Sequence, residues 1–380
     1  MSRADAILVL EDGRTFLGEA YAAVGETCGE AVFATGMTGY QEALTDPAYH
    51  RQVVTMTAPH IGNTGVNAVD DESARIWAAG MVIRQPAHVA SNWRAEAGLE
   101  DRLTRQGVVG ICQVDTRALT RHLARHGAMR VGISSTGTDR DALLAKVLAS
   151  PSMAGADLVA EVTADEPYVV EASGTKRFTV AALDLGVKRS TLHRMAQRGV
   201  QTHVLPAASS VEELLAVAPD AVFLSSGPGD PATATPQVEV TRQLLSRRVP
   251  VFGICFGNQV LGRALGLDTF KLKYGHRGIN VPVKDLATGK VEVTAHNHGF
   301  AVKKPDGAVG SVFDTDFGRA RISHVCLNDD VVEGLSCLDV PAFSVQYHPE
   351  AAAGPHDADY LFDRLVELIE GATMEAGTSA

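Results

Sequence analysis

The sequence predicts an α/β protein of two parts, an N-terminal α+β domain followed by a doubly wound domain built on a mixed sheet. The first half opens with a hairpin signal, in which Asp12-Gly13 separates two alternating apolar stretches, and glycine-rich joints follow it. From Arg177 onward, apolar strand-like runs alternate with helix-like segments. That alternation is typical of a parallel sheet covered by helices on both faces.

The domain boundaries follow from changes in this pattern. A chain of 380 residues is long enough for two domains, and we expect the first to cover residues 1–150, with a helix at 115–126. Residues 151–176 lack sustained periodicity, which predicts a linker. The second domain is expected over residues 177–370, and the last residues, 371–380, predict a disordered tail.

The second half can be divided into elements by apolar run length and helical spacing. We expect strands at 177–185, 202–206, 220–226 and 249–255, with helices at 188–198, 210–217, 237–247, 258–265 and 357–370. Residues 275–346 are richer in short β segments and turns. Because the first four strands alternate with helices, their carboxyl ends are expected to meet at one edge of the sheet.

Composition excludes several classes of function. The net charge is −11, the acids are dispersed and no Lys/Arg-rich run occurs, which argues against binding to nucleic acid or to a membrane surface. No apolar run is long enough for a membrane span or a signal peptide, so we expect a cytoplasmic protein. The five cysteines are scattered without C-x-x-C pairs, which argues against disulfides and a zinc ribbon.

One cysteine stands where an enzyme places a nucleophile. The stretch VPVFGICFGNQVLGRALG sets Cys255 between Gly253 and Gly257, at the turn from an apolar strand into a helix. Flanking glycines let the chain turn sharply and hold the sulfur at the carboxyl end of a sheet, and the positive end of the helix favours a thiolate. The alternative is a small buried cysteine at a strand-to-helix junction.

A cysteine nucleophile needs a base and a group that orients the base. In AFSVQYHPE, His348 follows an alternating apolar strand and Glu350 lies two residues beyond it. The carboxylate can then accept a hydrogen bond from one ring nitrogen while the other nitrogen faces the thiol. The sequence therefore predicts Cys255, His348 and Glu350 as a catalytic triad, with a surface turn as the alternative for the last two.

Two loops are expected near this triad. SSGPGD, residues 225–230, follows a predicted strand, and its exposed backbone N–H groups together with the amide of Phe256 would form an oxyanion hole. A phosphate loop is the competing interpretation, but the lysine of G-x-x-x-x-G-K-[ST] is missing, and an ordinary turn is the third. HNHGF, residues 296–300, is a weak metal-ligand pattern, so we expect no metal and instead a substrate contact by Asn297.

Together, GICFGNQ, SSGPGD, AHNHGF and YHPE resemble the triad-type (class I) glutamine amidotransferases, over residues 177–370. The segments FATGMTGYQEALTDPAYHRQVVTMTAPHIGNTGVN and QVDTRALTRHLARHGAMR resemble the N-terminal domain of carbamoyl-phosphate synthase small subunits. The resemblance implies a class I amidotransferase fold for the second domain. It also implies a glutaminase that supplies ammonia for making carbamoyl phosphate from bicarbonate and ATP, in arginine and pyrimidine biosynthesis.

The resemblance also assigns roles by motif. Cys255 would attack the glutamine amide to form a thioester, His348 would move the protons, and Glu350 would orient His348. The oxyanion would lie between the amides of Gly227 and Phe256. The implied contacts with glutamine are Ala48, Gly227, Gly229, Phe256, Gln259, Asn297, Gly299 and Phe300.

Two positions depart from the family pattern. Many relatives carry Ser where this chain has Ala48, so here only a backbone contact with glutamine would remain. The elbow reads CFGNQ where relatives often have CLGHQ, so Phe256 and Asn258 alter its packing but leave its backbone chemistry intact. Neither departure removes a member of the triad.

The implied partner is the large synthetase subunit. Nothing in this sequence resembles an ATP-binding domain, so we expect no cofactor on this chain, and ATP and a divalent metal such as Mg²⁺ on the large subunit. Because ammonia becomes unreactive ammonium in water, we expect transfer through a protein tunnel, with the N-terminal domain as the docking surface. Two alternatives remain open: a stand-alone γ-glutamyl hydrolase and a non-catalytic glutamine-sensing scaffold.

Overall fold

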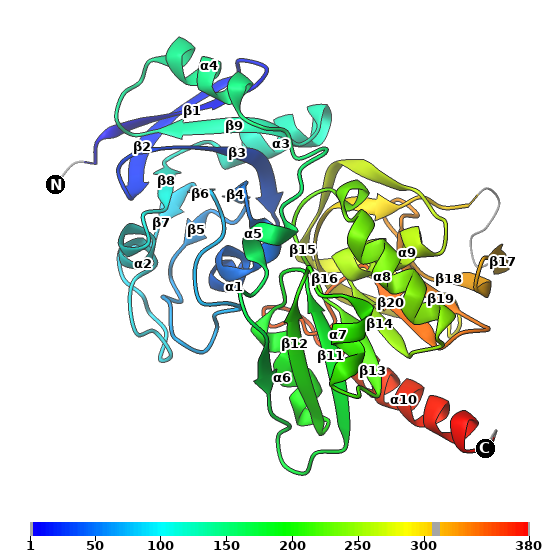
Figure 1. The fold of residues 1–380 in the computed structure, drawn as a ribbon. Helices are drawn as coiled ribbons and strands as arrows, with labels where there is room; N and C mark the ends of the chain where they lie inside the picture. Colours follow the sequence, from blue (N-terminus) through cyan, green and yellow to red (C-terminus); the bar gives the residue numbers. More distant parts are fainter. Residues whose placement is uncertain (1–2, 306–311, 379–380) are drawn as a thin grey trace. The chain divides into compact units, whose positions relative to one another are not determined.

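The structure, a computed structural model, describes residues 3–305 and 312–378 and divides into two compact units. The first unit consists of residues 1–156 and 273–278, and the second of residues 157–272 and 279–380. Figure 1 follows the chain through both. Within the described residues, no helix is both long enough and apolar enough to cross a membrane.

A closed barrel forms the centre of the first unit, with the strand order β1-β2-β8-β6-β4-β3-β9. Its strands are β1 (Asp5–Leu10), β2 (Thr15–Ala22), β3 (Glu26–Ala34), β4 (Gln52–Met56), β6 (Gly80–Val82), β8 (Val109–Cys112) and β9 (Met129–Ser134). The predicted hairpin is present as β1 and β2, and Gly13 turns with a φ of 83°. The sequence did not predict closure into a barrel, because β8 and β9 pair with strands far away in the chain.

The remaining elements of the first unit surround or extend this barrel. They are α1 (Tyr40–Thr45), the 3₁₀ helix η1 (Pro47–Tyr49), α2 (Leu99–Arg105), α3 (Thr116–His126), α4 (Arg140–Ala149), and the short pair β5 (His60–Ile61) and β7 (Gln85–Pro86). The helix predicted at 115–126 is α3. Asp115 caps it by accepting a hydrogen bond from the amide of Ala118.

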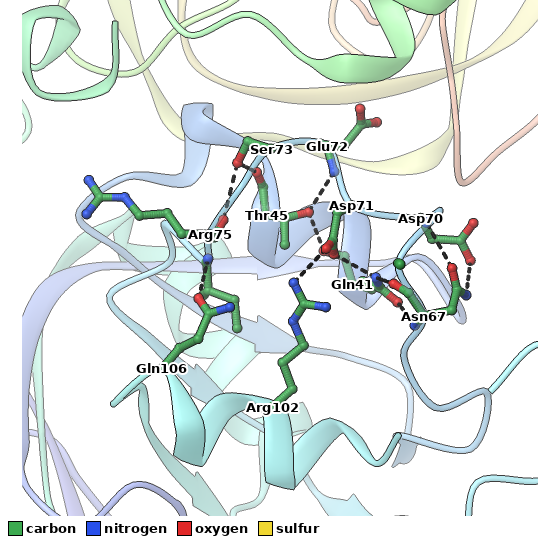
Figure 2. A network of polar contacts seen from close by, with 12 residues as sticks. Gln41, Thr45, Asn67, Asp70, Asp71, Glu72, Ser73, Arg75, Arg102 and Gln106 are labelled. Atoms are coloured by element: carbon green, nitrogen blue, oxygen red, sulfur yellow. Dashed lines mark hydrogen bonds and ion pairs between the residues drawn. The ribbon is translucent and has the colours of Figure 1, made fainter. Parts of the chain in front are cut away.

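A polar network fixes the irregular segment between β5 and β6 (Figure 2). Gln41 of α1 exchanges hydrogen bonds with the backbone of Asn67 and donates to Asp71. Arg102 of α2 forms an ion pair with the other carboxylate oxygen of Asp71 at 2.6 Å. The hydroxyl of Thr45 accepts the amide of Glu72 at 2.9 Å. The segment is therefore tied to both helices by side chains in the absence of regular backbone pairing.

One mixed sheet organises the second unit, in the order β10-β12-β11-β13-β14-β20-β19-β18-β15-β16, with β17 paired to β18. The parallel strands are β12 (Val200–Pro206), β11 (Phe178–Asp184), β13 (Ala221–Leu224), β14 (Val251–Ile254) and β20 (Ala342–Val345). The other strands are β10 (Tyr168–Val170), β15 (Thr269–Asp285), β16 (Val291–Val302), β17 (Val312–Thr315), β18 (Gly318–Cys326) and β19 (Val332–Cys337). The predicted doubly wound fold is confirmed.

Helices cover both faces of the parallel part of this sheet. They are α6 (Arg189–Gln197), α7 (Val211–Ala216), α8 (Thr235–Ser246), α9 (Phe256–Ala264) and α10 (Leu361–Thr378), and the 3₁₀ helix η2 (Pro231–Thr233) precedes α8. Alternate residues of β11 point to opposite faces: Leu183 packs in one core with α7, α8 and α9, whereas Val180 packs in the other with α6 and α10. This two-sided burial explains why the strands read as continuous apolar runs.

Two boundary predictions need correction. Residues 151–176 are more than a linker, because they contain α5 (Val159–Val162) and the strand β10, which pairs antiparallel with β12. Residues 371–378 are more than a disordered tail, because α10 continues to Thr378; residues 379 and 380 lie outside the described part of the chain. Beyond residue 370 the sequence has no periodic apolar pattern, so it did not predict that the helix continues.

Candidate active site

The predicted elbow forms at the carboxyl end of β14. Cys255 has a φ of 55°, caps α9 and donates its backbone amide to the carbonyl of Val345 at 2.8 Å. A Cβ added to Gly257 would lie 2.2 Å from the carbonyl oxygen of Leu224, and one added to Gly253 would lie 2.7 Å from a backbone oxygen. Both flanking positions therefore require glycine, and Cys255, which is 2% exposed, is held at the start of a helix.

His348 and Glu350 lie together beyond the end of β20. The backbone amide of His348 donates to the carbonyl of Ala295 at 2.8 Å, which fixes the histidine to β16. Its ring Nδ1 and the Oε1 of Glu350 are 2.7 Å apart, and both side chains are buried. Since a carboxylate accepts, Nδ1 carries the proton. Nε2 is buried and has no hydrogen-bond partner among the described residues.

A lysine that the sequence did not single out completes this group. The Nζ of Lys188 lies 2.9 Å from the Oε1 of Glu350, and the lysine side chain is only 9% exposed. Lys188 sits at the start of α6, just after β11. Asp184, the last residue of β11, holds this turn by accepting the amides of Gly186 and Val187. The only signal for Lys188 in the sequence was its position after a buried strand, whose carboxyl end lies at the same edge of the sheet as that of β14.

Charge sets the protonation of these buried groups. Burial would raise the pKa of Glu350, but the positive charges of Lys188 and His348 outweigh it and hold that pKa well below its usual range. Burial likewise would lower the pKa of His348. The negative charge of Glu350 outweighs this effect and raises the pKa of His348 to about 10. At neutral pH the imidazole is therefore protonated beside an ionised carboxylate.

The glycine loop and Asn297 lie at the elbow. The amide of Gly257 donates to the carbonyl of Ser225 at 3.0 Å, and a Cβ on Gly227 would lie 2.2 Å from the carbonyl oxygen of Leu185. The Sγ of Cys255 donates to the carbonyl of Asn297 at 3.6 Å. The side-chain amide of Asn297 is buried, and neither its nitrogen nor its oxygen has a partner among the described residues. It is therefore free to bind a polar ligand.

Gln259 makes contacts that the sequence did not predict. Its side-chain nitrogen donates to the carbonyl of Phe300 at 2.8 Å and to the Oε1 of Gln346 at 3.1 Å. Asn258 donates to the same oxygen of Gln346 at 3.1 Å and accepts from the hydroxyl of Ser344 at 2.9 Å. These amides tie α9 to β16 and β20, the elements that carry the other site residues. Asn258 thus has a defined packing role.

The remaining predicted contacts are placed as follows. Gly229 turns with a φ of 95° and is half-buried, Gly299 is half-buried on β16, and Phe300 and Phe256 are buried. Ala48 belongs to the first unit, where it is buried in η1 and donates its amide to Asp46. Its contact with glutamine stays a prediction.

Comparison with known proteins agrees with the motifs along the whole chain. The family described as "Carbamoyl-phosphate synthase small chain, CPSase domain" matches residues 8–133, and "Glutamine amidotransferase class-I" matches residues 181–368. The carbamoyl phosphate synthase small chain of Streptomyces avermitilis is 66% identical over 372 residues, which is 97% of both chains. The chain belongs to the carbamoyl-phosphate synthase small chains.

Other members of the family show the same extent of similarity. The small chain of Streptomyces coelicolor is 66% identical over 371 residues and 97% of both chains. That of Mycolicibacterium paratuberculosis is 58% identical over 370 residues, or 96% of this chain and 98% of its own. The predicted family and function are confirmed: this chain is the glutamine amidotransferase small chain of carbamoyl-phosphate synthase, with glutaminase activity.

Proposed function

We propose that Cys255, His348 and Glu350 are the catalytic triad by which this small chain releases ammonia from glutamine for use by a large subunit. The observation that carries this proposal is the geometry around the imidazole of His348. Its Nδ1 is fixed on Glu350 at 2.7 Å, and its Nε2 remains without a partner among the described residues. Cys255 lies close enough to the same imidazole to interact with it.

The first half of the reaction forms a thioester. The thiolate of Cys255 attacks the amide carbon of glutamine, and the carbonyl electrons move to oxygen between the amides of Gly227 and Phe256. The adduct then collapses and its C–N bond breaks. His348 gives the proton on Nε2 to the departing nitrogen, which leaves as ammonia.

The second half releases glutamate. The now neutral His348 takes a proton from water, whose oxygen attacks the thioester carbon. The C–S bond breaks, Cys255 leaves as a thiolate beside the protonated histidine, and the new carboxylic acid ionises to glutamate. Glu350 holds one ring nitrogen throughout, and Lys188 keeps Glu350 ionised. The starting state is thereby restored.

Glutamine would be held by groups from four segments: β16, the loop after β13, α9 and η1. The unpartnered amide of Asn297 supports its role as a contact, because a buried amide without a partner gains a hydrogen bond when a polar ligand enters. Gly227, Gly229, Phe256, Gln259, Gly299 and Phe300 are proposed to complete the site with backbone and packing contacts, together with Ala48 of the first unit. Gln259 would act mainly through the position it gives to Phe300.

The partner is proposed to be the large chain that the family name implies. That chain would bind ATP, Mg²⁺ and bicarbonate, and it would receive the ammonia through a tunnel. The first unit would provide the docking surface, because it lies outside residues 181–368, which the class I glutamine amidotransferase family matches. No cofactor is proposed for the glutaminase step.

The test of this assignment is Cys255→Ser in the complex with the large subunit. We expect glutamine-dependent carbamoyl phosphate synthesis to fall by at least about 10³-fold, because a hydroxyl is a far weaker nucleophile at neutral pH. Synthesis driven by added ammonia should be unchanged, since it bypasses the thioester. Equal loss of both activities would contradict the proposed role of Cys255.

A further inference from the structure

A cavity lies at the amino ends of β14 and β20, at the end of the sheet opposite the catalytic elbow. Its volume is about 400 Å³, and it is lined by α10 and by the turn that joins β19 to β20, all within the second unit. Cys255 and His348 follow the carboxyl ends of the same two strands, so the cavity is separate from the candidate active site. Its lining mixes charged side chains with apolar ones, which are Leu338, Val340, Pro341, Ala342, Phe343 and Leu368. A cavity of this size is typical of a site for a small organic molecule.

One guanidinium group in this cavity has no anionic partner. Arg364 belongs to α10 and is half-buried, and its Cζ lies 4.8 Å from the centre of the ring of Phe343 on β20. Its guanidinium forms no hydrogen bond and no ion pair with another residue in the described ranges 3–305 and 312–378. Stacking on an aromatic face holds the plane of a guanidinium group but leaves its N–H groups unused. The side-chain donors of Arg364 are therefore available to a ligand.

The other charged groups of the cavity suit an anionic ligand. Arg248 also lines it, and its Nη1 donates to the carbonyl oxygen of Asp339 at 2.7 Å. The carboxylate of Asp339 accepts hydrogen bonds from the guanidinium of Arg319 at 2.8 and 3.0 Å, so its charge is already paired. Glu367 is exposed on α10, where water screens its charge. An acidic ligand therefore meets two guanidinium groups and one carboxylate that is unpaired but screened.

We propose that this cavity binds a small organic anion, in which a carboxylate, sulfonate or phosphate ester is attached to an apolar body. Arg364 binds the anionic group, because the planar fork of a guanidinium matches the oxygens of such groups. The apolar body packs against Leu338, Val340 and Leu368, which line the same cavity. The volume of about 400 Å³ favours such a molecule over an inorganic anion, which would fill only a small part of it.

Fluorescence titration of the full chain with anilinonaphthalene sulfonate tests this proposal, because that probe joins apolar aromatic groups to one anionic group. We expect saturable binding of about one probe per chain. Arg364→Met keeps the apolar stem but removes the charge, so it should weaken binding by at least about tenfold. Arg242→Met is the matched control and should bind the probe as the wild type does. Arg242 also stacks on a phenylalanine of the second unit, Phe317, at 5.0 Å, but its guanidinium already donates to Ala264 and Asp316.

Two further measurements separate this site from general apolar binding and from misfolding. Phenylnaphthylamine lacks the sulfonate, so it should bind the wild type and Arg364→Met equally. Ala372→Phe places a larger side chain in the cavity from α10, so it should weaken binding of the sulfonate probe although Arg364 is present. Both variants should keep the circular dichroism spectrum of the wild type. The proposal is overturned if the sulfonate probe does not bind the wild type, or if Arg364→Met or Ala372→Phe binds it as tightly as the wild type does.

Discussion

At the scale of single residues, the pKa of His348 depends on the charged side chains around it. Buried in an apolar environment, an imidazole would lose its proton, yet Glu350 reverses this and raises the pKa of His348 to about 10. Lys188 acts in the opposite direction on the imidazole but keeps Glu350 ionised. In the proposed mechanism, this histidine would give its proton to the departing amide nitrogen.

His348→Asn and Glu350→Gln separate proton transfer from orientation. We expect His348→Asn to lower the glutaminase kcat by roughly 10²–10⁴-fold, because no other group supplies the proton, and Glu350→Gln to lower it less. Because Glu350 raises the pKa of His348, its loss lowers that pKa. The alkaline loss of kcat/KM should therefore begin at lower pH in Glu350→Gln than in the wild type. An alkaline limb that does not move would show that Glu350 does not control the proton on His348.

Sequence reasoning singled out those candidate site residues whose signals are local. Cys255 lies between two glycines, and His348 and Glu350 are two positions apart, so each pattern fits in a few letters. Lys188 gave no such signal, because it meets Glu350 only after the sheet forms.

At the scale of elements, the elbow depends on close approach of backbones. The loop after β13 and the start of α9 touch through Gly257, whose amide donates to Ser225. The space for a side chain there is already filled by the carbonyl oxygen of Leu224, 2.2 Å from the ideal Cβ position. Backbone atoms cannot move aside as the end of a flexible side chain can.

Gly257→Ala should therefore displace the start of α9. We expect glutaminase kcat to fall by about 10²-fold, because a small misplacement of a nucleophile is that costly. Ammonia-driven synthesis by the complex should be retained. Gly371→Ala in α10 is the control: nothing lies within 4 Å of its Cβ position, so activity should not change. Full glutaminase activity in Gly257→Ala would contradict the close approach.

Asp71 should stabilise the first unit through its contacts with two helices. Its carboxylate bonds Gln41 of α1 and Arg102 of α2, and it is only 11% exposed (Figure 2). We expect Asp71→Ala to lower the free energy of unfolding by about 2 kcal/mol, the value of a hydrogen-bonded, largely buried carboxylate. Tryptophan fluorescence during urea unfolding reports on this unit, because Trp77 and Trp93 both lie in it.

Asp141→Ala provides the matched control for Asp71→Ala. Asp141 also pairs with an arginine of the first unit, but it is 86% exposed, so the change should be within about 0.5 kcal/mol. Equal effects of the two substitutions would show that the network around Asp71 adds no stability.

At the scale of the whole molecule, the two halves differed in how far the sequence predicted them. The second unit follows a strand–helix alternation, so periodicity alone indicated a doubly wound sheet. In the first unit, the barrel joins β2 to β8 and β3 to β9. Such pairings leave no local pattern, and only the hairpin of β1 and β2 was visible. The family resemblance therefore carried more of the prediction in the first half than in the second.

The central claim is that this chain makes ammonia for a partner, and coupling tests it most directly. Glutamate release from glutamine is measured for the purified chain alone, and then with its large subunit, ATP, Mg²⁺ and bicarbonate. We predict slow hydrolysis by the chain alone that rises by at least about tenfold in the complete system, with one carbamoyl phosphate formed for each glutamine consumed. Fast hydrolysis that is indifferent to the partner would contradict the claim and indicate an independent hydrolase.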